Sequence, residues 1–167
     1  FAVNAEAPKA FVEALDSFGG RLLQLSTDFV FNGQKNCPYK VDDSIAPLSI
    51  YGASKAAGEK EAMQLPGSRV LRTSWVYGPF GNNFCLTMLH LHRLKGKNNE
   101  PIRVVSDQIG CPTSTETLAH TCWKVLLFQG KCNLIDIFHW TDAGQVSWYD
   151  FAVAIGELGV QLGLLDK

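Results

Sequence analysis

The sequence predicts an α/β fold built around a parallel sheet. Two short apolar segments, residues 21–26 and 70–75, have the length of buried strands, and Gly19-Gly20 precedes the first of them. A helical segment from residue 51 to about residue 64 lies between the two. A strand, a helix and a second strand in this order make a βαβ unit, whose two strands run parallel.

The N-terminal part of the chain predicts one more helix and a long loop. Residues 4–17 have an apolar side at helical spacing, with Asn4 as the expected N-cap. Residues 27–49 show no helical period and carry several turn-forming residues, which predicts a loop. Long loops in compact domains are often functional, and this one leads directly into the helix at residue 51.

The chain after Gly78 predicts a smaller mixed α/β portion. Ser147 and Asp150 have the spacing of a capping box, and so do Thr113 and Glu116. The predicted elements are helices at 84–95, about 116–128 and 147–162, and strands at 102–106 and 136–141. The strand at 136–141 is expected to return to the parallel sheet.

Composition excludes several classes of protein. The 167 residues are 46% hydrophobic and 19% charged, which is typical of a globular chain with one substantial core. The net charge of −1 gives no basic surface for nucleic acid, and no apolar run reaches the length of a membrane span. Five scattered cysteines without a C-x-x-C pair indicate a reducing, cytoplasmic compartment, and the four histidines form no metal-binding motif.

A candidate site lies at the carboxyl ends of the two strands, where ligands bind in open α/β sheets. Thr27 and Trp75 are placed at those ends. Tyr51 and Lys55 are four residues apart, so a helix puts both on one face. A nearby ammonium favours a phenolate, which suits a tyrosine to proton transfer near neutral pH. Taken alone, the same spacing also fits an ordinary helix start with a surface lysine.

The motifs around this pair resemble those of a known superfamily. The order is an apolar strand ending in a hydroxyl residue, a loop, a Tyr-x-x-x-Lys helix and a second apolar strand. This order resembles the extended short-chain dehydrogenase/reductases and, within them, the dTDP-4-dehydrorhamnose reductases. The resemblance extends over nearly the whole chain, through the stretches Val3-Asn4-Ala5-Glu6-Ala7-Pro8, Gly81-Asn82-Asn83-Phe84, Val104-Val105-Ser106-Asp107-Gln108-Ile109-Gly110-Cys111-Pro112-Thr113-Ser114 and Ser147-Trp148-Tyr149-Asp150-Phe151.

The resemblance implies reduction of the C4 ketone of dTDP-4-dehydro-L-rhamnose by NADPH or NADH. Tyr51 would donate the proton, and Lys55 would support Tyr51 and hold the ribose of the cofactor. Thr27 would hydrogen-bond the ketone oxygen, since a hydroxyl both donates and accepts. These three residues are the predicted catalytic set, and Tyr51 and Lys55 are also the predicted cofactor ligands.

The resemblance also implies further contacts to the dTDP-sugar substrate, from Thr27 itself and from Asp28, Trp75, Asn82, Asn83 and Gln108. Each has a structural alternative, namely a turn for Asp28 and the asparagines and a core position for Trp75. Phe29 stands where the family commonly has tyrosine, which implies one hydrogen bond fewer.

The family also sets the expected extent of the chain. No G-x-G-x-x-G fingerprint for the cofactor pyrophosphate is present, so we expect an internal piece that lacks the first half of the nucleotide-binding domain and the C-terminal end. Residues 1–78 would be the second half of that domain, and 79–167 would be mainly substrate-binding. We expect this piece alone to be inactive. A homodimer is expected from the family, and a magnesium ion at its interface cannot be assigned to residues here.

Two alternatives to the reductase remain open. One is another sugar-nucleotide epimerase or reductase of the superfamily, which would use the same tyrosine and lysine. The other is a non-catalytic relative that resembles the regulatory beta subunit of methionine adenosyltransferase. A 4,6-dehydratase is disfavoured, because such enzymes carry Asp-Glu after the threonine and this chain has Asp28-Phe29.

Overall fold

The computed structural model describes residues 1–98, 100–128 and 136–166. The chain forms two compact units, one of Phe1–Thr73 with Leu118–Trp140 and one of Ser74–Thr117 with Thr141–Lys167. The chain leaves the first unit at Thr73 and comes back to it at Leu118. The assignment of residues 1–78 to nucleotide binding and of 79–167 mainly to substrate binding stays a prediction.

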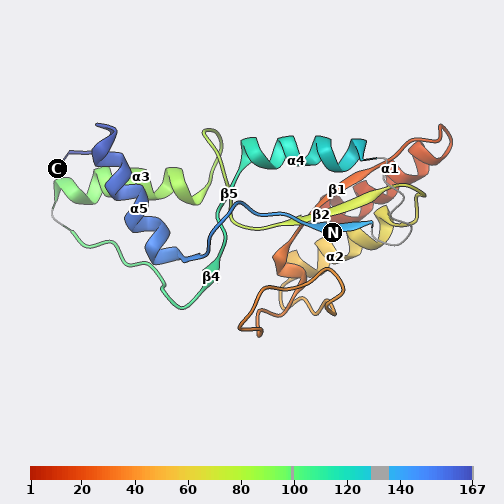
Figure 1. Cartoon of the computed structure of the whole chain (residues 1–167), viewed down its shortest axis with the longest axis horizontal. Coiled ribbons are helices and arrows are strands. Elements are labelled where there is room, and N and C mark those ends of the chain that lie inside the picture. The colour runs from red at the N-terminus through yellow and green to blue at the C-terminus, as the bar shows by residue number, and fades with distance from the viewer. Residues whose placement is uncertain (99, 129–135, 167) are drawn as a thin grey trace. The chain divides into compact units, whose positions relative to one another are not determined.

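The first unit is built on a parallel three-stranded sheet, which confirms the predicted fold class. Its strands are β1 (Leu23–Thr27), β2 (Arg69–Thr73) and β6 (Ile137–His139), in the order β1-β2-β6 (Figure 1). The register pairs Thr27 with Thr73 and places Arg72 between Ser26 and His139. The carboxyl ends of β1 and β2 therefore coincide.

Helix α2 (Ile50–Ala62) connects β1 to β2 and packs closely on its neighbours. The Ser49 hydroxyl caps its start by accepting from the Gly52 amide at 3.0 Å. A Cβ at Gly52 would collide with the Phe29 carbonyl, and one at Gly58 would collide with the Asn4 carbonyl. Only glycine allows this approach, so α2 is held tightly against the two segments that precede it.

A hydrophobic cluster joins the sheet to α4 (Thr115–Leu127). Within the first unit, Leu71 of β2 packs with Leu118 and Val125, supported by Leu23 and Phe138. Figure 1 shows α2 and α4 on different sides of the strands. The sheet is thus covered on both sides, as a parallel sheet requires.

The N-terminal helix starts earlier than predicted. A π-helical turn, η1 (Ala2–Glu6), runs directly into α1 (Ala7–Asp16). Asn4 lies inside this turn and is not an N-cap; its amide donates to the Ser54 hydroxyl at 3.0 Å. The long loop was predicted correctly except for a short 3-10 helix, η2 (Asp28–Val30), directly after β1.

The second unit is centred on two packed helices, α3 (Phe84–Lys97) and α5 (Trp148–Gln161). Met88, Ala152 and Ile155 form their common core. Two small sheets accompany them: β3 (Val76–Tyr77) pairs in parallel with β5 (Thr113–Ser114), and β4 (Ile109–Gly110) pairs antiparallel with β7 (Val146–Ser147). The capping box of Ser147 and Asp150 is present at the start of α5, as predicted.

Two predicted strands differ from the structure. Residues 102–106 are not a strand; Ile102 and Val104 alternate because they pack on the α3–α5 core. The strand predicted at 70–75 ends at Thr73, because Trp75 has a left-handed backbone with φ of 48°. None of the described helices is long and apolar enough to cross a membrane.

Candidate active site

Thr27 lies at the carboxyl end of β1 and is buried. Its hydroxyl donates to Oδ1 of Asp28 at 3.0 Å and accepts from the Phe29 amide at 3.2 Å. The second bond makes Thr27 the cap of η2. The hydroxyl must therefore turn its proton away from Asp28 before it can donate to any ligand.

Asp28 is held next to Thr27 and is partly buried. Burial raises the pKa of its carboxyl group, and the hydrogen bond from Thr27 opposes this shift only in part. The protonated form of Asp28 is thus easier to reach than that of an exposed aspartate.

Tyr51 and Lys55 lie in the first turns of α2, on the face predicted from their spacing. The Lys55 ammonium donates to the Leu25 carbonyl of β1 at 2.6 Å. The Tyr51 ring meets the Phe29 ring edge-on, with 5.8 Å between centroids. Contacts to β1 and η2 therefore place both side chains beside the strand that ends in Thr27, so the first unit brings these residues together.

Burial also acts on the lysine. The pKa of Lys55 is lowered, mainly because burial disfavours the charged amine, while the Glu59 carboxylate acts in the opposite direction. An ammonium has three N–H donors, and the Leu25 carbonyl takes one of them. The others are available to a bound hydroxyl.

The strand ends carry further polar groups that fit a ligand. The hydroxyls of Ser26 and Thr73 are buried and, in the part of the chain that is described, have no hydrogen-bond partner. Thr73 is directly opposite Thr27 in the register. Buried hydroxyls are normally satisfied, so unpaired ones at this end of the sheet suit a cofactor that brings polar atoms.

A buried charged cluster connects α2 to the strands β2 and β6. Arg72 of β2 makes two bonds to Glu59, from Nε to Oε1 at 2.9 Å and from Nη2 to Oε2 at 2.8 Å. His139 of β6 lies 3.3 Å from Arg72 Nη1, and its other ring nitrogen lies 3.2 Å from the Tyr39 carbonyl. Burial and the Arg72 charge lower the pKa of His139.

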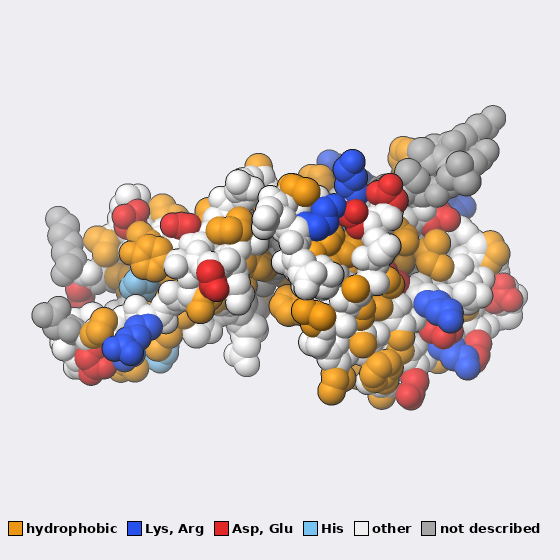
Figure 2. Space-filling view, turned by 90° about the horizontal axis from the view of Figure 1, so that it is seen from below, with side chains coloured by type: hydrophobic (Ala, Val, Ile, Leu, Met, Phe, Trp, Pro, Cys, Tyr) orange, Lys and Arg blue, Asp and Glu red, His pale blue; other side chains and the backbone are white. Residues whose placement is uncertain are grey.

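Hydrophobic groups reach the surface around this site. Figure 2 shows hydrophobic side chains at several places on one face of the molecule. In the first unit, Phe29, Ile50 and Tyr51 are 55%, 80% and 49% exposed. These residues flank the hydroxyl and ammonium groups with apolar surface.

The other predicted substrate residues belong to the second unit. Trp75 stacks on Trp148, with 3.5 Å between centroids and 9° between ring planes. Asn83 caps α3 by accepting from the Leu86 amide at 3.1 Å, and it donates to the Gly78 carbonyl at 2.9 Å. Its turn role is therefore present in the structure. Asn82 and Gln108 are exposed.

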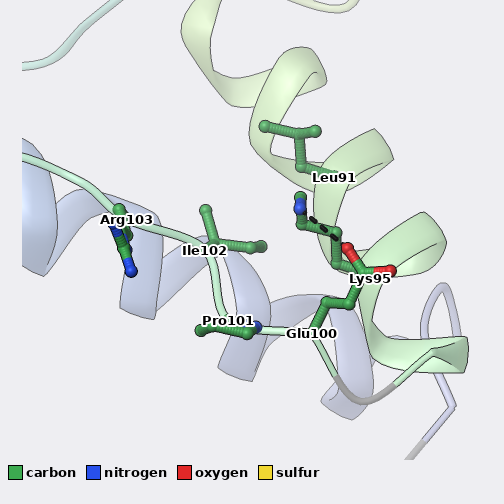
Figure 3. A pocket seen from close by; sticks show the side chains of 6 residues that line it. All are labelled: Leu91, Lys95, Glu100, Pro101, Ile102 and Arg103. Atoms are coloured by element: carbon green, nitrogen blue, oxygen red, sulfur yellow. Dashed lines mark hydrogen bonds and ion pairs between the residues drawn. The ribbon is translucent and has the colours of Figure 1, made fainter.

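A surface pocket in the second unit involves none of the predicted site residues. Leu91, Lys95, Glu100, Pro101, Ile102 and Arg103 line it. Figure 3 shows Lys95 paired with Glu100 at one end, at 3.0 Å, and Arg103 at the other. Lys95 is partly exposed, and Glu100 and Arg103 are exposed.

Among the described residues, no three His, Cys, Asp or Glu side chains gather as a metal site. Cys37, Cys85, Cys111 and Cys122 are free thiols, and Cys132 lies outside the described residues.

Sequence reasoning did not identify Glu59, Arg72, His139 or Trp148. A charged residue inside an apolar strand, as at Arg72, was the one available signal, because such a residue is rarely buried without a partner. The partners themselves could not be read from the chain, since they depend on how α2 packs on the sheet and on the register of β2 with β6.

The fold and the grouping of Thr27, Tyr51 and Lys55 define an α/β protein of the Rossmann type, with polar side chains at the carboxyl ends of its strands. The family model described as RmlD substrate binding domain matches residues 1–160. The chain belongs to this family of dTDP-4-dehydrorhamnose reductases.

Individual relatives agree with this assignment. A dTDP-4-dehydrorhamnose reductase of Aggregatibacter actinomycetemcomitans is 40% identical over 170 residues, covering 100% of this chain and 56% of the relative. The spore coat polysaccharide biosynthesis protein SpsK of Bacillus subtilis is 44% identical over 162 residues, covering 94% and 54%. The chain therefore spans about half the length of the curated relatives it matches.

Solved structures give the same result. The dTDP-4-dehydrorhamnose reductase of Bacillus anthracis, in complex with NADP, has a TM-score of 0.83 and 37% identity, covering 94% of this chain and 54% of that one. The corresponding protein of Clostridium acetobutylicum has a TM-score of 0.83 and 41% identity, covering 94% and 53%. This chain is homologous to NAD(P)-dependent sugar-nucleotide reductases.

Proposed function

We propose that the protein containing this chain reduces the C4 ketone of dTDP-4-dehydro-L-rhamnose, giving dTDP-L-rhamnose. The observation that carries the proposal is the placement of Tyr51 and Lys55 on one face of α2, against the strand that ends in Thr27. Relatives that are 40% identical and named for this reaction support the choice of substrate. The whole reaction needs the part of the protein outside this chain.

The proposed reaction gives Tyr51, Thr27 and Lys55 a role each. Tyr51 donates its phenolic proton to the C4 oxygen as negative charge develops there. Thr27 turns its hydroxyl from Asp28 to the same oxygen and stabilises that charge. The reduced nicotinamide cofactor supplies the reducing equivalent when it is bound. Lys55 keeps its positive charge beside Tyr51 and donates its remaining N–H groups to the ribose hydroxyls.

Five further residues are proposed to contact the substrate. Asp28 accepts from sugar hydroxyls, and Trp75 presents an indole face to the sugar. Asn82, Asn83 and Gln108 donate to the nucleotide diphosphate or the sugar. We also propose that the protein acts in the cytoplasm and forms a homodimer.

The test uses the full-length gene product, with enzymatically prepared dTDP-4-dehydro-L-rhamnose and NADPH or NADH. Wild-type protein is expected to oxidise the cofactor, and the loss of nicotinamide absorbance measures the rate. Tyr51→Phe should lower the rate by about 10²–10⁴-fold, because the proton donor is lost. Tyr149→Phe, which changes a tyrosine of similar exposure on α5, should keep the rate.

Product analysis separates the alternatives. A 4-epimerised nucleotide sugar without net oxidation of the cofactor would point to an epimerase. Folded wild-type protein that changes no sugar nucleotide would overturn the proposal and favour a regulatory relative.

A further inference from the structure

Glu59 lies one helical turn beyond Lys55 on α2 and is buried. Side chains four residues apart on a helix are neighbours, so a lysine and a glutamate at this spacing attract each other. Such a pair would draw the Lys55 ammonium along the helix, away from the strand end. The described structure contains no ion pair between them.

The Glu59 carboxylate is bound by Arg72 instead. Arg72 binds both carboxylate oxygens of Glu59 in a forked arrangement, and both side chains are 5% exposed. Both oxygens of the Glu59 carboxylate are therefore bound by a side chain of the sheet. Lys55 instead donates to the Leu25 carbonyl at 2.6 Å, which points its ammonium toward β1.

Arg72 is itself held by three other contacts. His139 of β6 lies 3.3 Å from Nη1, the Val41 carbonyl accepts from the same atom at 3.4 Å, and the Phe31 ring lies 5.1 Å from the guanidinium carbon. The charged and titratable groups facing this cluster are Glu59 on α2, His139 on β6 and, more distantly, Asp43 on the loop. The guanidinium therefore has one well-defined position.

We propose that Arg72 is a positioning residue that withholds Glu59 from Lys55, so that the ammonium keeps free N–H donors for the vicinal hydroxyls of a ribose. The choice of ribose rests on the proposed function above. The competition between Arg72 and Lys55 for one carboxylate rests on the structure alone, so the two can fail separately.

The experiment compares variants of the full-length protein in two measurements. Arg72→Met frees Glu59, and Glu59→Leu with Arg72→Met removes both charges and leaves an apolar pair of similar size. Arg69→Met is the matched control, because Arg69 is on the same strand and donates to the backbone carbonyls of Val125 and Phe128. The first measurement is NMR titration of ¹³C-labelled lysine, with Lys55 assigned by its absence in Lys55→Met. The second is the kinetics of ketone reduction.

In Arg72→Met, the Lys55 amine should titrate at higher pH than in wild type, because a carboxylate now pairs with it. Its kcat/KM should fall by about 100-fold, as expected when a reacting group is displaced by about 1 Å. The double variant should titrate at or below the wild-type pH and should recover most of kcat/KM. Arg69→Met should match wild type in both measurements.

Recovery of kcat/KM in the double variant distinguishes a positioning role of Arg72 from a general contribution to stability. A double variant as impaired as Arg72→Met, or a Lys55 titration unchanged by Arg72→Met, would overturn the proposal. If Arg72→Met does not fold, Arg72→Lys serves in its place, because lysine cannot bind both oxygens and leaves one for Lys55. If wild type reduces no ketone, the proposed function fails. The Lys55 titration still shows whether Arg72 keeps the Glu59 carboxylate from pairing with Lys55.

Discussion

The ring of Phe29 packs edge-on against the ring of Tyr51, with 73° between the ring planes and 5.8 Å between centroids. Phe29 follows Thr27 by two residues, and its amide donates to the Thr27 hydroxyl at 3.2 Å. One residue therefore contacts both the proposed proton donor and the proposed ketone ligand. Its side chain stands where the family resemblance implies a tyrosine.

Phe29→Tyr should strengthen substrate binding, because it adds a hydroxyl beside Tyr51. A neutral hydrogen bond contributes about 0.5–1.5 kcal/mol, so KM for the sugar nucleotide should fall about 2–10-fold with kcat little changed. Steady-state kinetics on the full-length protein measure this. Phe11→Tyr, at an exposed position of α1, is the control. An unchanged KM in Phe29→Tyr would show that the substrate does not reach this position.

Lys55→Met should abolish most of the activity. The variant loses the ammonium that supports Tyr51 and binds the ribose, and we expect kcat/KM to fall by about 10²–10⁴-fold. Lys60→Met changes an exposed lysine of the same helix and should stay near wild type. Circular dichroism checks that both variants are folded. A folded Lys55→Met enzyme with normal kinetics would remove Lys55 from the mechanism.

Gly58→Ala should destabilise the protein, because the added Cβ would collide with the Asn4 carbonyl. Overpacking of this kind costs about 1–3 kcal/mol, measured by urea denaturation. Gly96→Ala is the matched control in α3, where a Cβ meets nothing within 4 Å. That change should stabilise by about 0.5–1 kcal/mol, since alanine is the better helix former. Equal effects of the two substitutions would contradict the close approach of α2 to η1.

His139 should make stability depend on pH. Its pKa is lowered from the ordinary value of 6.5, so the folded state favours the neutral ring. The stability it contributes is present above the unfolded pKa and is lost as the pH falls through that value and through the lower folded one. The melting temperature of wild type should therefore fall on acidification below about pH 6.5.

His139→Gln keeps a donor and an acceptor but does not titrate, so its melting temperature should fall less over the same interval. The two proteins should differ least near pH 8, where both side chains are neutral. Parallel melting curves at every pH would show that the imidazole does not charge against Arg72.

Short-range spacing was enough to predict much of this protein. The 3.6-residue helical period put Tyr51 and Lys55 on one face, and the strand–helix–strand order predicted the parallel sheet with Thr27 at its end. The capping box at Ser147 was equally readable. These features depend on residues close together in the chain, whose geometry the backbone largely dictates.

Contacts between distant residues were decided only by the tertiary structure. Arg72 meets His139 because the register of β2 and β6 pairs them, and it meets Glu59 because α2 packs on the sheet. Residues 102–106 have a strand-like alternation, but they pack on α3 and α5 and find no strand to pair with in the described structure. Trp75 ends its strand early with a left-handed backbone and stacks on Trp148, 73 residues away (148 − 75). A local pattern carries no information about which partner is available, and burial of charge and apolar surface against that partner selects the final conformation.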